Sequence, residues 1–117
     1  MTALNNFGAV MSFAIEMESK LRDFYTAAGD TARAADCDKR RVTLERVRRE
    51  NVTEIKLEPI TDLEGDDYPI DTSDISATGM TTAATIAARF YVDAAPKINV
   101  REAQRALERA GRGHGVG

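Results

Sequence analysis

The chain has 117 residues, which fits one domain with a single core rather than two domains. Hydrophobic residues make up 43% of it and charged residues 30%, which excludes a disordered or low-complexity protein. The net charge of −3 provides no overall attraction to nucleic acid or to an anionic membrane. The one cysteine, Cys37, excludes an internal disulfide and is typical of a reducing compartment.

No segment resembles a membrane span or a targeting signal. The longest apolar stretch, residues 7–15, is shorter than the roughly 18 residues that a membrane-spanning helix needs. No lysine or arginine precedes Lys20, so the positively charged start of a secretory signal is missing. We therefore expect a cytoplasmic protein with no membrane partner.

Apolar spacing predicts two helices in the first half of the chain. Over residues 5–28, apolar and aromatic side chains recur at alternating intervals of four and three, and Glu18 is the charged member of that stripe. Gly29 supplies the stop. A second helix is expected over residues 34–57, and Pro59 follows it. Its inner face consists of Cys37, Leu44, Val47, Asn51 and Ile55.

A long loop and a third helix come next. Residues 58–72 contain two prolines, a glycine and a cluster of aspartates, so we expect a crossover loop there. The third helix is predicted over residues 74–95, because Pro96 prevents it from continuing.

The last predicted helix is short and spans residues 100–110. Asn99 and Glu102 have the spacing of a capping box at its start, with asparagine in place of serine or threonine. The glycine-rich tail 111–117 is expected to fray. All four helices form a single domain that covers residues 1–117.

The first and third helices repeat each other. A shift along the chain that places Phe24 on Phe90 also places Tyr25 on Tyr91 and Glu18 on Ala84. Each aromatic pair is followed by a helix break and another helix, which is typical of two helical hairpins. The sequence thus predicts an all-α four-helix bundle made of two helical hairpins joined by the long crossover loop.

A family resemblance starts from the run Ala14-Ile15-Glu16-Met17-Glu18, followed by Phe24-Tyr25. This run resembles the first helix of rubrerythrin-type ferritin-like proteins, in which a stripe glutamate stands seven residues before the tyrosine. Glu18 matches that glutamate. The resemblance covers residues 10–57 and, through the repeat, residues 75–95. It implies a ferritin-like bundle, whose di-iron site takes one glutamate from each of two helices and a Glu-x-x-His from each of the other two.

Most ligands of that site are missing here. Ala84 stands where the third helix would repeat Glu18, and the second helix offers Asn51 with Glu54, or Glu50 with Thr53, in place of Glu and His. The fourth helix turns Ala103, Leu107 and Ala110 inward. The sole histidine, His114, lies among glycines after the predicted helix end. The resemblance therefore implies a degenerate di-iron site.

The candidate metal ligands are Glu18, Glu50 and Glu54, which either still bind a metal or are vestiges of the lost site. Iron or manganese is the possible metal, and no other cofactor is expected. Glu18 has two interpretations. It lies at the edge of the stripe or pairs with an arginine, with Asn51 or with a tyrosine hydroxyl. Alternatively, two chains bring two copies of Glu18 together with Glu50 or Glu54 in an intersubunit site. A buried carboxylate without a partner would cost several kcal/mol, so burial requires one of these arrangements.

Helix lengths favour self-association. The fourth helix is about half as long as the first at 1.5 Å per residue. Apolar stripe residues at an uncovered end, among Phe7, Val10, Met11 and Ile55, would form a patch suited to an interface. The expected partner is a second copy in a homodimer or other homo-oligomer, with another protein as an alternative.

The sequence favours a non-enzymatic bundle that acts through self-association or partner binding after loss of the di-iron site, and no catalytic residue is assigned. The first alternative is an iron- or manganese-binding protein with a reduced or intersubunit carboxylate site. The second is a nucleic-acid-associated protein, which the negative net charge disfavours. It would use basic residues of the second and fourth helices: Lys39, Arg40, Arg41, Arg46, Arg48, Arg49, Arg101, Arg105, Arg109 and Arg112.

Overall fold

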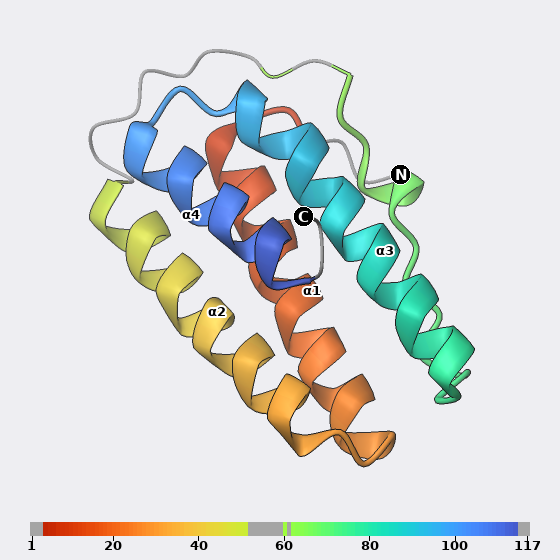
Figure 1. The fold of residues 1–117 in the computed structure, drawn as a ribbon. Helices are drawn as coiled ribbons and strands as arrows, with labels where there is room; N and C mark the ends of the chain where they lie inside the picture. Colours follow the sequence, from red (N-terminus) through yellow and green to blue (C-terminus); the bar gives the residue numbers. More distant parts are fainter. Residues whose placement is uncertain (1–3, 52–59, 61, 115–117) are drawn as a thin grey trace.

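The computed structural model describes residues 4–51, 60 and 62–114, which form four α-helices and two short 3₁₀ turns (Figure 1). The helices are α1 (Phe7–Ala27), α2 (Thr31–Asn51), α3 (Ala77–Ala94) and α4 (Arg101–Gly113). The 3₁₀ turns are η1 (Gly65–Asp67) and η2 (Ala95–Lys97). The described ranges contain no β-strand. The prediction of an all-α chain with four helices is confirmed.

α2 and α3 begin at different residues from those predicted. α2 starts at Thr31 instead of 34, because the Asp30 carboxylate accepts a hydrogen bond from the backbone N–H of Arg33 at 3.1 Å. α3 starts at Ala77 instead of 74, because the hydroxyl of its N-cap, Ser76, accepts from the backbone N–H three residues later. The predicted last turns of the second helix, residues 52–57, lie outside the described residues.

α4 corrects two predictions. It continues to Gly113 instead of ending at residue 110, and the side chain of His114 that follows is buried, so residues 111–114 are not frayed. A Cβ at Gly111 would lie 3.0 Å from the Cβ of Tyr91, so this glycine lets α4 approach α3 closely. The predicted capping box is wrong, because the N-cap is Val100 and makes no side-chain hydrogen bond.

α1 and α2 form an antiparallel hairpin that turns at Gly29, whose φ of +83° favours glycine (Figure 1). The pairing register follows from this short turn. Arg22 on α1 bonds to Asp38 on α2 at 3.0 Å. Glu18, four residues farther from the turn on α1, bonds to Arg40, two residues farther from it on α2. Residues farther from the turn on α1 therefore pair with residues farther from the turn on α2.

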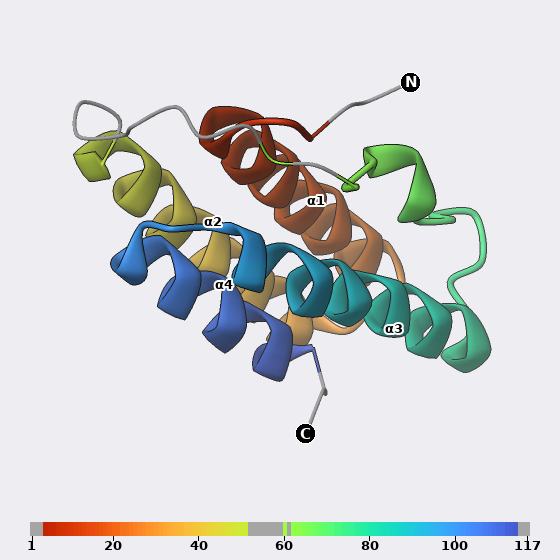
Figure 2. The same ribbon diagram turned by 90° about the horizontal axis from the view of Figure 1, so that it is seen from above.

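α3 and α4 form the second packed pair, and α4 also lies against α2 (Figure 2). With 13 residues, α4 is about 20 Å long at 1.5 Å per residue, against about 32 Å for the 21 residues of α1 or α2. The amide of Asn51, at the end of α2, donates to Glu102 at 2.9 Å and sets where α4 begins. α4 therefore runs along the carboxyl-terminal part of α2, which pairs with the amino-terminal half of α1.

The predicted position of the uncovered end is consequently wrong. Phe7, Val10 and Met11 are buried and belong to the main hydrophobic core. The open end is the opposite one, where the last turns of α1 meet the first turns of α2. Ile55, the fourth residue of the predicted patch, is outside the described residues.

The aromatic pairs of the internal repeat are buried in both helices. The rings of Phe24 and Tyr25 lie 5.4 Å apart between centroids, and those of Phe90 and Tyr91 lie 5.2 Å apart. Tyr68, from the connection before α3, packs edge-on against Phe90 at 5.3 Å. The repeat therefore marks core positions. Among the described residues, no helix has the length and apolar character needed to cross a membrane.

A buried ion cluster as the candidate functional site

The carboxylate of Glu18 is the centre of a polar cluster inside the bundle. Glu18 is 0% exposed, and each of the other three helices supplies a partner for it. Arg40 of α2 donates from Nε to Glu18 Oε1 at 3.0 Å, and the Tyr91 hydroxyl of α3 donates to Oε2. His114, which caps α4, places Nε2 2.8 Å from Oε2. These four residues, together with Cys37 as a fifth, form what we call the ion cluster.

The helical stripes explain why the cluster forms. Arg40 stands three residues after Cys37 and four before Leu44, so it belongs to the inner face of α2. His114 stands four residues after Ala110, so it continues the inner stripe of α4 beyond the helix end. Sequence reasoning missed both residues, because an arginine among other basic residues suggests a solvated surface and the glycines suggested a frayed tail.

Glu18 is ionised in the folded protein at neutral pH. Burial raises its pKa, but the hydrogen bond and charge of His114, then the charge of Arg40 and the hydrogen bond of Tyr91, outweigh it and hold that pKa below the ordinary 4.5. An ionised carboxylate only accepts hydrogen bonds, so His114 donates from Nε2. The His114 ring also stacks on Tyr91, with centroids 5.9 Å apart.

Neither potential nucleophile in the cluster is activated. Burial, followed by the charge of Glu18, raises the pKa of the Cys37 thiol to about 12, and Arg40 Nη2 donates to its sulfur at 3.3 Å. Burial and the charge of Glu18 raise the pKa of Tyr91 well above its ordinary value. Because the nucleophilic form of a cysteine is the thiolate, Cys37 stays inert at neutral pH.

The cluster joins the four corners of the bundle through charge-assisted hydrogen bonds. The guanidinium of Arg40 provides the positive charge beside Glu18, and its side chain is 17% exposed. No group of three or more His, Cys, Asp or Glu side chains in the described part of the chain is arranged to hold a metal ion. The arrangement is that of a structural ion pair with two additional donors.

The structure brings only one of the predicted metal ligands into this cluster. Glu50 is exposed and its Oε1 lies 4.0 Å from Arg46 Nε. It lies ten residues beyond Arg40 on α2, which is about 15 Å of helix. Glu54 lies outside the described residues. Metal binding by Glu18, Glu50 and Glu54 stays a prediction.

The alternatives for Glu18 within one chain can be separated, and the intersubunit site stays a prediction. It pairs with an arginine and a tyrosine hydroxyl, as one interpretation predicted. It is not at the edge of the stripe, and Asn51 is not its partner, because the Asn51 amide donates to Glu102 and to the Val47 carbonyl.

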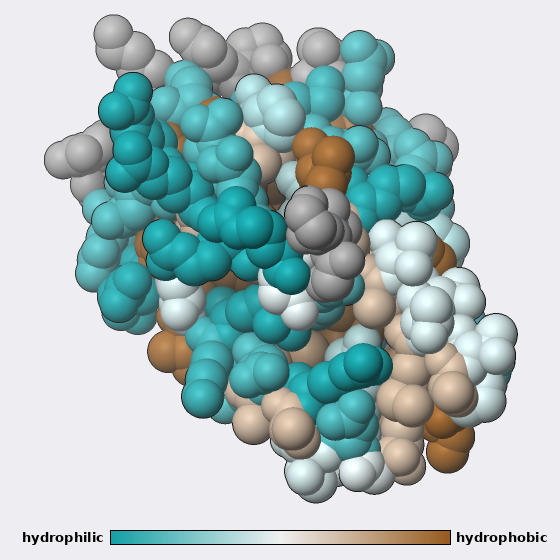
Figure 3. All heavy atoms as spheres, in the orientation of Figure 1, coloured by the Kyte–Doolittle hydropathy of each residue, from teal (hydrophilic) through white to brown (hydrophobic). Residues whose placement is uncertain are grey.

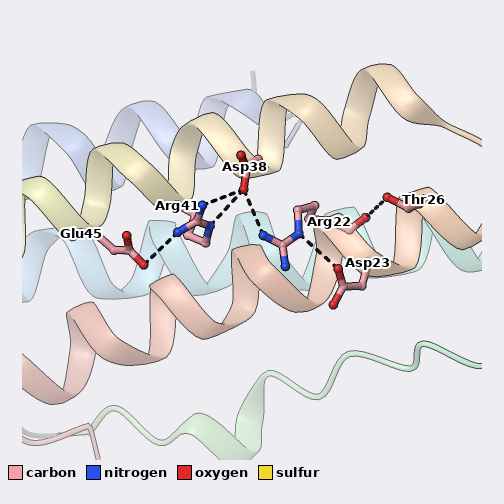
Figure 4. Close-up of polar contacts among 6 residues, drawn as sticks. All are labelled: Arg22, Asp23, Thr26, Asp38, Arg41 and Glu45. Carbon is pink, nitrogen blue, oxygen red and sulfur yellow. Dashed lines mark hydrogen bonds and ion pairs between the residues drawn. The ribbon is translucent and has the colours of Figure 1, made fainter.

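The basic residues of α2 and α4 lie in different surroundings. Figure 4 shows a surface ladder in which Asp38 accepts from Arg22 and Arg41, and Arg41 also bonds to Glu45 at 3.0 Å. These pairs neutralise part of the charge of α2, and exposed pairs of this kind contribute little to stability. The predicted stripe of α4 is exposed and consists of Arg101, Arg105, Arg109 and Arg112.

A scan against protein-family models matches no family, and searches of curated proteins and of solved structures return no match.

Proposed function

We propose that the chain is a non-enzymatic, ferritin-like four-helix bundle that acts by association with a second copy of itself, with the ion cluster standing where the family holds its metal. The observation that carries this proposal is the engagement of both oxygens of Glu18. Arg40 bonds to Oε1, and Tyr91 and His114 bond to Oε2. The residue that resembles the family's ligand is therefore already neutralised by protein groups.

Metal chemistry fits poorly with this arrangement. A cation at Glu18 would have to displace a guanidinium 3.0 Å from the same carboxylate, and the displaced charge would be left in a site where Arg40 is only 17% exposed. A metal ion that takes the place of the Arg40 guanidinium beside Glu18 would need further carboxylates as ligands. Glu50, on the outer face of α2, does not supply them within one chain.

The surface that supports self-association is the outer face of α3, defined by Ile75, Thr78, Thr82 and Val92. Ile75 is 48% exposed and Val92 is 53% exposed. Residues 75–88 carry no charge, although 30% of the chain is charged. Figure 3 shows tan and white residues gathered over the lower part of α3, in contrast to the teal residues over α2 and α4. Depletion of charge is typical of interface cores.

A second copy fits this face because a two-fold axis would place the uncharged residues 75–88 of one chain against those of the other. The threonines have short side chains, so two such helices can approach closely. The test is sedimentation velocity over a range of protein concentrations. We expect the wild type to form a dimer and Thr82→Lys to be monomeric, because the lysine would bury a charge between the two helices.

The matched control is Ala35→Lys, which adds the same charge at an exposed position of α2. It should leave the dimer intact. A wild type that stays monomeric at every concentration, or a Thr82→Lys variant that dimerises as well as the control, would exclude the outer face of α3 as the interface. Elemental mass spectrometry after incubation with ferrous iron or manganese tests the metal alternative. Stoichiometric metal that Glu18→Gln abolishes would replace the proposed function.

A further inference from the structure

A polar pocket of about 330 Å³ opens beside the ion cluster. It lies between α2 and α3 and is bordered by Gly113 and His114 at the end of α4. It exists because the short α4 ends before the two longer helices do (Figure 1). Its lining includes Arg33, Asp36, Arg40, Thr81, Thr85 and Gly113. The volume is in the range of small-ligand sites.

One nitrogen of the Arg40 guanidinium makes no hydrogen bond within the ion cluster. Nε donates to Glu18 and Nη2 donates to Cys37, and Nη1 takes part in neither bond. A Cβ at Gly113 would come within 2.6 Å of Nη1. The absence of a side chain at residue 113 therefore lets the end of α4 lie close to this nitrogen, and the bonds to Glu18 and Cys37 hold the guanidinium in a fixed orientation.

Arg33 supplies a second guanidinium to the same wall. Its Nε lies 3.4 Å from Asp30, and its guanidinium carbon lies 5.8 Å from the centroid of the buried Tyr25 ring. The side chain remains 56% exposed, so its terminal nitrogens can reach a ligand. Guanidinium groups are the preferred partners of carboxylates, because their planar N–H groups match the two oxygens.

The wall contributed by α3 offers acceptors instead of donors. The hydroxyl of Thr81 donates to the carbonyl of Ala77 at 3.0 Å, and that of Thr85 donates to the carbonyl of Thr81 at 2.9 Å. Each hydroxyl has only one proton, so both oxygens face a ligand as acceptors. The Asp36 carboxylate, on α2, adds a third acceptor.

Charge balance narrows the class of ligand. The guanidiniums of Arg33 and Arg40 already have carboxylate neighbours in Asp30 and Glu18, and Asp36 also lines the pocket. A highly charged anion is therefore less well matched than a single carboxylate. We propose that this pocket binds a small organic acid that carries a hydroxyl or ammonium donor next to its carboxylate. The carboxylate meets Arg40 and Arg33, and the donor meets Thr81, Thr85 and Asp36.

Four probes distinguish recognition of the carboxylate from recognition of the donor group. Each is titrated into the ¹⁵N-labelled full chain and followed by ¹H–¹⁵N NMR. Glycerate and serine carry both a carboxylate and donors, propionate carries only the carboxylate, and glycerol carries only donors. We expect glycerate or serine to give saturable shifts at the amides of Thr81, Thr85 and Gly113, with affinities at least about tenfold above those of the other two probes. The better of the two identifies the donor as a hydroxyl or an ammonium group.

Variants assign the binding to this pocket. Arg33→Gln and Thr81→Val should each weaken binding of the better probe by about tenfold, the effect of one lost charge-assisted or acceptor contact. The controls make the same changes outside the pocket. Arg105→Gln replaces an exposed arginine of α4, and Thr26→Val removes a hydroxyl that donates to the backbone carbonyl of Arg22. Shifts that do not saturate, equal responses to all four probes, or an unchanged affinity in Arg33→Gln would each overturn the proposed site.

Discussion

Arg40 Nε lies 3.0 Å from Glu18 Oε1, although 22 residues separate the two along the chain. Both side chains are directed into the bundle, and compared with the surface pair of Arg22 and Asp38 this pair lies four residues farther from Gly29 on α1 and two residues farther on α2. A buried pair of this kind is costly to break from one side, because the remaining charge stays in the core.

We predict that Glu18→Leu lowers the free energy of unfolding by about 3–5 kcal/mol, the usual effect of breaking a buried pair. The double variant Glu18→Leu, Arg40→Met should recover most of that loss, because it leaves neither charge unpaired. Urea unfolding of both single variants, the double variant and the wild type gives the coupling free energy. A double variant that is as unstable as the sum of the single variants would show that the two residues act independently.

A second prediction concerns pH. The fold lowers the pKa of Glu18 below its ordinary 4.5, so its contribution to stability is complete above the unfolded-state pKa and is lost as the pH falls through 4.5 and then through the lower folded-state pKa. We expect Glu18→Gln to flatten this acid branch of the stability curve, measured by urea unfolding at a series of pH values.

The control for the pH series is Asp38→Asn. Arg41 and then Arg22 lower the pKa of Asp38 through hydrogen bonds at the surface. Added salt should therefore reduce the share of the acid branch that Asp38→Asn removes, since exposed charges are screened, and should leave the share of Glu18 largely unchanged. Equal salt sensitivity in the two variants would argue that Glu18 is accessible to solvent.

A third prediction concerns the end of α4. His114→Ala removes a donor to the buried Glu18 and a ring that stacks on Tyr91, so we expect a loss of about 1–3 kcal/mol. Hydrogen exchange should accelerate in the last turn of α4, including Gly111, and stay unchanged in the α1–α2 hairpin. Arg112→Ala, an exposed neighbour, should alter neither measurement. Unchanged protection in His114→Ala would mean that helix packing alone holds this end in place.

A fourth prediction contrasts two glycines. A Cβ at Gly79 would overlap the carbonyl oxygen of Asp74 and lie 2.8 Å from the attached carbon, so Gly79→Ala must displace backbone at the start of α3. We expect a loss of about 1–3 kcal/mol in the free energy of unfolding. Gly8→Ala meets nothing closer than 3.4 Å and should be neutral or stabilising, because alanine favours a helix. Thermal unfolding followed by circular dichroism distinguishes the two.

A fifth prediction concerns Cys37. Its thiol is buried and its pKa is raised to about 12, so iodoacetamide should modify the native protein far more slowly than the unfolded protein. Mass spectrometry after timed exposure, with and without urea, measures the ratio. Rapid modification of the native chain would indicate that the α1–α2 hairpin opens often.

The number of helices was predictable from the sequence because the stripes of α1 and α3 are regular. The repeat of Phe24 and Tyr25 at Phe90 and Tyr91 marked core positions, and both pairs are buried. The helix boundaries were less predictable, because a capping residue such as Ser76 has neighbours of the same chemistry that could also serve as the N-cap. The end of α4 was missed because glycine is a poor helix former unless a close approach such as that of Gly111 to Tyr91 stabilises it.

The centre of the site was predictable and its partners were not. Glu18 stands out as a charge in an apolar stripe, which is a local signal. Its pairing with Arg40 depends on the register of the hairpin, and its contact with His114 joins residues 96 positions apart. No periodic pattern in a single segment reports contacts of that range. The register set by Gly29 could have identified Arg40 if the two helices had been aligned from the turn outward.

The three partners of Glu18 lie at increasing distances along the chain, with separations of 22 residues for Arg40, 73 for Tyr91 and 96 for His114. Closing a longer loop has a higher entropic cost, so the contact within the α1–α2 hairpin should form early and the contact with His114 late. Substitutions at Arg40 should then slow folding, whereas substitutions at His114 should mainly accelerate unfolding. The lifetime of the native state would depend on the last of the three contacts to form.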